Sequence, residues 1–192
     1  MSLVLANRQR ACKINRRRLH EIAAVLLAEL AGPEAILEIN LVGPAQMAKV
    51  NQTFLRHEGP TDVITFDYRE ETGPGVPPGL PAFPPVPGKA AARPKTPSRP
   101  VRTLKRPEGR APKSPPGGGP LHGELFICPA VAVAQAREFG TDWRSELVRY
   151  VIHGLLHLLG HDDRQPAARR RMKQAEGRRL RDISRRFALS KL

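Results

Sequence analysis

The chain has 192 residues, a formal net charge of +14 and two cysteines. This length allows one domain with a real core, and Cys12 and Cys128 form neither a disulfide framework nor a CxxC metal motif. The N-terminus lacks the features of a signal peptide and the longest apolar run, residues 22–31, carries Glu29, so we expect a cytoplasmic protein without a membrane span.

The positive charge is concentrated in two segments. Residues 73–122 hold nine Lys or Arg against one acid, and residues 164–192 hold eleven against two, while the remaining residues are near neutral. A one-signed excess of this size predicts a polyanionic partner, most simply nucleic acid. Solubility alone is the alternative explanation.

The part of the chain before residue 73 alternates between strand and helix patterns. Apolar residues at helical spacing and Gly-Pro pairs place helices and turns, and β-branched and aromatic residues mark strands. The predicted elements, in chain order, are a weak strand at 2–6, a helix at 16–31, a strand at 34–42, a helix at 45–55 and a central strand at 61–68.

Composition changes abruptly at residue 73. Residues 73–122 contain fifteen of the twenty prolines and eight of the sixteen glycines. Such a segment buries too little apolar surface to offset the entropy of ordering, so we predict a disordered basic insertion. It divides a single domain formed by residues 1–72 and 123–192. The insertion suits a loose RNA-binding arm, and a loop expansion without a role is the alternative.

Regular structure resumes after the insertion. The predicted elements are a strand at 123–128, a helix at 129–139, a helix at 143–159 and a basic helix from Pro166, which should pack through Met172, Leu180, Ile183 and Phe187. The alternation indicates α/β or α+β, and we favour α+β. We expect a small mixed sheet of about four strands wrapped by about five helices, the central helix carrying metal-binding histidines.

The strongest chemical signal lies at the end of the predicted apolar helix. His153 and His157 are four residues apart, so both rings project from one face and can hold one metal ion. Gly160 then ends the helix. The segment after it offers a third ligand, for which we favour Asp163 over His161.

A catalytic zinc site uses about three protein ligands and a water. The peptidase motif His-Glu-x-x-His would require a glutamate where this chain has Gly154, so a metallopeptidase lacks its general base. Zinc-activated water can still attack a phosphodiester, which the basic segments favour as substrate. Arg56 is a candidate for stabilising the negative charge of the transition state.

Residues 153–163, His-Gly-Leu-Leu-His-Leu-Leu-Gly-His-Asp-Asp, resemble the signature of the YbeY family of bacterial endoribonucleases. The resemblance extends to residues 51–66 and 123–127. It implies a single-strand-specific, zinc-dependent endoribonuclease that matures the 3′ end of small-subunit ribosomal RNA and acts in ribosome quality control. It implies catalytic roles for Arg56, His153 and His157.

The chain departs from the family pattern at the third metal ligand and at the arginine. The family's third ligand is most often histidine, where this chain has Asp163. The family's arginine directly follows the aromatic residue, but here Leu55 follows Phe54, and Arg56 or the neighbouring His57 would fill the role.

The leading hypothesis is therefore an endoribonuclease with one Zn²⁺ ion, whose partners are single-stranded RNA and the small ribosomal subunit. An RNA-binding ribosome assembly factor with a structural metal is the alternative, and a metallopeptidase is less favoured. The sequence does not indicate the oligomeric state.

Overall fold

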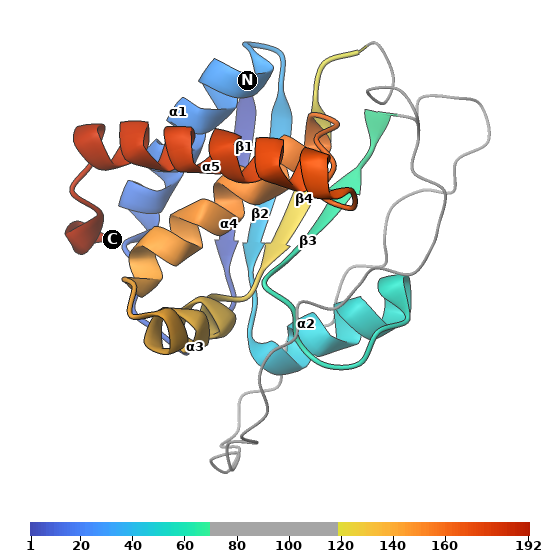
Figure 1. The fold of residues 1–192 in the computed structure, drawn as a ribbon, viewed down its shortest axis with the longest axis vertical. Coiled ribbons are helices and arrows are strands. Elements are labelled where there is room, and N and C mark those ends of the chain that lie inside the picture. Colours follow the sequence, from blue (N-terminus) through green and yellow to red (C-terminus); the bar gives the residue numbers. More distant parts are fainter. Residues whose placement is uncertain (70–118) are drawn as a thin grey trace.

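In the computed structural model, which describes residues 1–69 and 119–192, the chain forms a four-stranded mixed sheet (Figure 1). Its order is β1-β2-β4-β3, with the first three strands parallel and β3 antiparallel to β4. This confirms the expected α+β fold. The strands are β1 (Ser2–Asn7), β2 (Ile36–Leu41), β3 (Val63–Asp67) and β4 (His122–Ile127).

The expectation that residues 61–68 form a central strand is wrong, because β3 lies at the edge of the sheet. Its β-branched and aromatic composition has another cause. Val63 packs on the main core beneath α4, while Ile64 and Phe66 belong to a second apolar cluster on the opposite face. Burial on both faces therefore gives an edge strand the composition of a central one.

The described residues contain five α-helices, as expected. They are α1 (Arg16–Ala31), α2 (Pro44–Val50), α3 (Pro129–Phe139), α4 (Trp143–Leu158) and α5 (Pro166–Arg186). The helix predicted at 45–55 is divided into α2 and a π-helical turn, η1 (Asn51–Leu55), and a short 3-10 helix, η3 (Leu189–Lys191), ends the chain. The predicted disordered insertion falls almost entirely on residues 70–118, outside the described residues. In the described ranges no helix has the length and hydropathy that crossing a membrane requires.

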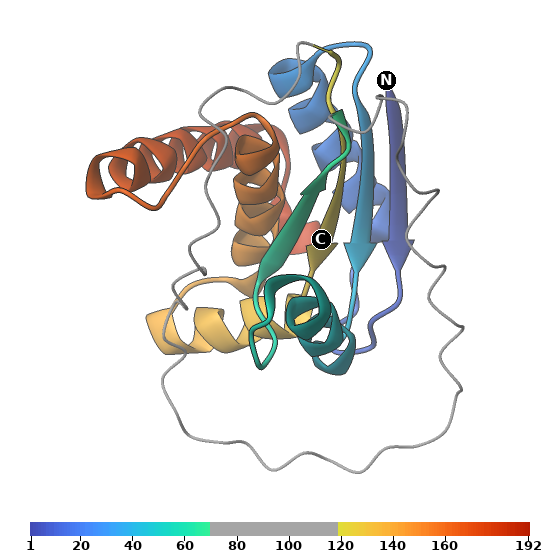
Figure 2. The same cartoon turned by 90° about the vertical axis from the view of Figure 1, so that its right-hand side faces the viewer.

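The helices α1, α4 and α5 lie on one side of the sheet (Figure 2). There they enclose the main core, to which β2 contributes Leu37, Ile39 and Leu41. α4 lies between the sheet and α5, and α3 packs beside it. The expected contacts of α5 are confirmed, because Met172 and Ile183 are buried in this core and Leu180 and Phe187 pack against it.

Two glycines allow α4 to approach the sheet closely. A Cβ atom on Gly154 would lie 2.7 Å from a methyl of Leu125 in β4. A Cβ atom on Gly123 would lie 2.8 Å from a methyl of Leu158 and 2.9 Å from the carbonyl oxygen of Phe66. The face of α4 beside the sheet is therefore filled, and its histidines project elsewhere.

Candidate metal centre

α4 is defined at both ends by local interactions. The side chain of Asp142 accepts a hydrogen bond from the backbone of Ser145, as N-cap residues do. At the other end Gly160 has φ +85°, and its N–H donates to the carbonyl of His157 at 2.9 Å. Because glycine adopts this conformation without strain, the chain reverses and returns residues 161–163 beside the last turn of the helix.

The two histidine rings of this turn meet edge to face, with their centroids 4.5 Å apart. Their Nε2 atoms are 2.9 Å apart. The Nδ1 atom of His157 lies 3.0 Å from the carbonyl oxygen of His161, and that of His153 lies 2.6 Å from Oε1 of Glu176. A carbonyl only accepts hydrogen bonds, as does an ionised carboxylate, so both Nδ1 atoms act as donors. In neutral rings both Nε2 atoms would then be hydrogen-bond acceptors 2.9 Å apart, an arrangement that a cation between them stabilises.

Asp163 completes this group. One ligand atom from each of His153, His157 and Asp163 lies within 4.8 Å of the others. Two imidazoles and one carboxylate form a donor set that suits zinc in catalytic sites. The structure thus brings Asp163 to the histidines, while the exposed His161 contributes its backbone carbonyl to the ring of His157.

The electrostatic surroundings of His153 favour positive charge. Burial, the largest influence, lowers its pKa, but the hydrogen bond and charge of Glu176 raise it, as do the charges of Asp62 and Asp163. The net result is a raised pKa. The negative charges of Glu176, Asp62 and Asp163 thus favour positive charge at His153, as a cation site requires.

Glu176 is the residue of this site that the sequence reasoning missed. It lies on α5 and is 6% exposed, although α5 is otherwise a very basic helix. Carboxylates often hold metal-binding histidines in this way, which fixes the tautomer and the ring orientation. A signal was present, because Glu176 stands four residues after Met172 and four before Leu180, inside the apolar stripe of the helix.

Arg69 fixes the end of α4 to the edge strand. Its guanidinium donates to both carboxylate oxygens of Asp67, at 2.9 and 2.6 Å, and also to the backbone carbonyl of Leu158. The side chain of Arg69 is only 8% exposed. This bidentate pair holds the helix terminus that carries His157 against β3.

The structure does not connect Arg56 to the histidines. Arg56 is exposed at the end of η1 in the left-handed region, with φ 55°. Among the described residues no hydrogen bond or ion pair joins its side chain to His153, His157 or Asp163. The Nε2 atom of the neighbouring His57 is buried, and none of the residues that the structure describes forms a hydrogen bond with it.

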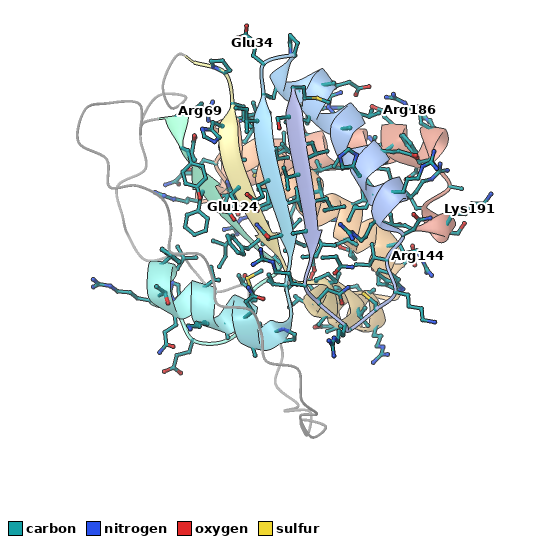
Figure 3. All side chains as sticks on the ribbon, turned by 180° about the vertical axis from the view of Figure 1, so that it is seen from behind. Glu34, Arg69, Glu124, Arg144, Arg186 and Lys191 are labelled. Atoms are coloured by element: carbon teal, nitrogen blue, oxygen red, sulfur yellow. The ribbon has the colours of Figure 1, made fainter. Side chains whose placement is uncertain are left out.

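A second polar cluster lies on the opposite face of the sheet (Figure 3). Glu124 accepts hydrogen bonds from the amide of Asn40, at 2.8 Å, and from the hydroxyl of Tyr68, at 2.6 Å. Burial raises the pKa of Glu124, and the nearby charge of Glu38 adds to this. The sheet separates this cluster from α4, so it does not belong to the candidate metal centre.

Comparison with known proteins gives one consistent family. Residues 4–184 match the family model described as Endoribonuclease YbeY. Curated proteins with that name include one from Corynebacterium efficiens, 30% identical over 183 residues, covering 95% of this chain and 74% of the relative. Another, from Chlorobium luteolum, is 30% identical over 151 residues, covering 78% and 76%.

A solved structure supports the fold. The solution structure of TM1509 from Thermotoga maritima superposes with a TM-score of 0.51 at 20% sequence identity. The match covers 94% of this chain and 88% of that one. At this level of identity the likeness concerns the arrangement of the elements.

Proposed function

The chain belongs to the endoribonuclease YbeY family, and we propose that it is a metal-dependent endoribonuclease acting on single-stranded RNA. The observation that carries the metal dependence is the convergence of both Nε2 atoms and the Asp163 carboxylate on one point. The net charge of +14 supports a polyanionic substrate. The domain formed by residues 1–72 and 123–192 would contain the complete site.

We assign one Zn²⁺ ion to His153, His157 and Asp163. When bound there, zinc would supply a hydroxide near neutral pH and polarise a phosphoryl oxygen. The protein's own contribution is to hold the ligands in place. Glu176 and the carbonyl of His161 keep both imidazoles oriented with Nε2 towards the shared point.

The remaining roles follow from where each residue lies. Gly154 is packed on Leu125, so this position offers neither a general base nor room for one, which argues against a metallopeptidase. The exposed guanidinium of Arg56 is free to move to the phosphate, where it would offset the developing negative charge. His57 is the alternative for that role.

Family membership and the basic charge together support ribosomal RNA as the substrate. We propose that the chain processes the 3′ end of small-subunit ribosomal RNA, contacts the small ribosomal subunit and takes part in ribosome quality control in the cytoplasm. Residues 73–122, with nine basic residues against one acid, would add to RNA affinity.

The direct test is cleavage of single-stranded ribosomal RNA by the purified protein. We expect cleavage by the zinc-loaded protein, loss of cleavage after chelation with recovery on adding zinc, and loss in His157→Ala. An Arg56→Gln variant should bind zinc normally but cleave more slowly, by about 100-fold or more if it acts as an oxyanion stabiliser. Cleavage that persists in His157→Ala and in chelator would overturn the metal mechanism.

The alternative of an assembly factor with a structural metal predicts different results. A structural site is closed by four protein ligands, and its loss unfolds the domain. In the described ranges the group contains three such residues, which favours an open position for water. Unfolding on chelation, together with RNA binding but no cleavage, would establish the alternative.

A further inference from the structure

The solvent side of α5 carries a row of arginines. Arg170, Arg171, Arg178 and Arg181 are all exposed, and we call them the arginine ridge. At 100° per residue their side chains fall within one arc of about 100°, opposite the buried Met172. Along the helix axis the ridge spans about 16 Å.

The structure separates these arginines from the others on the helix. Arg179 and Arg186 both form ion pairs with Glu29 of α1. Arg186 is labelled in Figure 3. Arg169 donates a hydrogen bond to the backbone carbonyl of Asp163. Within the described parts of the chain, no ion pair involves a ridge arginine. The sequence shows one basic helix, whereas the structure divides its arginines into a set that is bonded to other residues and a set without ion pairs among the described residues.

The ridge is also fixed relative to the candidate metal centre. α5 begins three residues after Asp163, and its Glu176 holds the ring of His153 at 2.6 Å. From there the helix crosses α4 towards α1 (Figure 1). The ridge lies on the side of α5 opposite Glu176, but Arg170 and Arg171 stand near the start of the helix, close in sequence to Asp163. A polyanion at the metal centre would therefore reach the ridge by passing around this end of α5.

The composition of α5 favours a nucleic acid over a membrane. A helix that lies in a membrane interface needs a free apolar face, but the apolar stripe of α5, with Met172 and Ile183, is buried against the core. What remains exposed is mostly cationic. Arginine is suited to bidentate contacts with phosphate oxygens.

We propose that the arginine ridge binds the phosphate backbone of the RNA segment that flanks the cleaved bond, an extension of the substrate site that rests on the proposed endoribonuclease function. The contacts would be independent of base sequence, since they reach phosphates. The ridge would thus set how strongly long RNAs are held relative to short ones.

The test compares two double variants of equal charge on the same helix. Arg178→Gln with Arg181→Gln removes half of the ridge, and Arg179→Gln with Arg186→Gln removes the two arginines bound to Glu29. Glutamine keeps the helix propensity close to that of arginine. Binding of a single-stranded RNA is measured against salt in the His157→Ala background, so that the RNA stays intact.

The ridge variant should make the negative slope of log K against log salt shallower by about 1.4, because each phosphate contact of a single strand contributes about −0.7. Its affinity deficit relative to the parent should then shrink about sevenfold between about 50 and 200 mM salt. The control variant should keep the parental slope. Equal slopes for the two double variants would overturn the proposal, because net charge alone would then explain RNA binding.

A second readout does not need the His157→Ala background. In the otherwise unchanged protein, the ridge variant should raise KM for a long RNA and leave cleavage of an RNA of about five nucleotides unaltered. Binding that depends on the ridge without any cleavage would refute the proposed function but keep the ridge. Loss of binding to anionic lipid vesicles with RNA binding unaffected would instead assign the ridge to membranes.

Discussion

The helices α4 and α5 pack against one another but are held in opposite ways. α4 buries ten of its 16 residues, whereas α5 buries three of its 21 and carries nine basic residues. The first is positioned by close packing on both sides, the second by a narrow apolar stripe and by ion pairs at its surface. Each nevertheless contributes to the candidate metal centre, α4 through its histidines and α5 through Glu176.

This difference shows where each kind of substitution should matter. In α4 any added volume meets the core, while in α5 most positions face water and tolerate change. The exception on α5 is the buried carboxylate of Glu176, which contacts His153, so we expect its substitution to affect the candidate metal centre.

The largest contrast should come from one glycine in each helix. Gly154→Ala adds a Cβ 2.7 Å from Leu125, a fully buried side chain with little freedom to move. Overpacking should outweigh the gain in helix propensity and lower the free energy of unfolding by about 1 to 2 kcal/mol. Gly177→Ala in α5 meets only the end of Arg181, at 3.4 Å, and should raise it by about 0.5 to 1 kcal/mol.

Urea unfolding of the zinc-free proteins measures both values. If the two alanines changed stability in the same direction, α4 would have room beside the sheet, and the distinction between the helices would fail.

The next contrast concerns the two acids of α5. Glu176→Gln removes the charge that orients His153 and should weaken zinc binding by about 10- to 100-fold, as the loss of outer-shell partners does. Asp182→Asn, also on α5, changes an exposed residue whose ion pair in the described part of the chain is with Arg185, and should leave zinc affinity unchanged.

Competition with a fluorescent chelator at fixed pH measures both affinities. Equal affinities for Glu176→Gln and the parent would show that the ring of His153 needs no support from α5, and that the two helices act separately.

The difference between the helices also explains what the sequence could reveal. His153 and His157 were predictable because a spacing of four residues within one helix is a local relation. The apolar stripe of α5 indicated that Glu176 is buried, but not what it contacts. Its contact with His153 depends on α5 folding back across α4 and joins residues 23 apart. The edge position of β3 was likewise hidden, because strand order is decided by tertiary packing rather than by local composition.

The smallest effect should come from the ion pairs that join α5 to α1. Glu29→Gln removes the partner of both Arg179 and Arg186, but these side chains are 38 to 47% exposed, so the free energy of unfolding should fall by at most about 1 kcal/mol. The deficit should disappear at about 1 M salt, where screening extends to about 3 Å. Zinc affinity should not change, since the apolar stripe beneath α5 still holds Glu176 in place. A deficit of several kcal/mol, or one that salt leaves intact, would mean that surface charge rather than the stripe positions α5, and that the support of His153 depends on the far end of the helix.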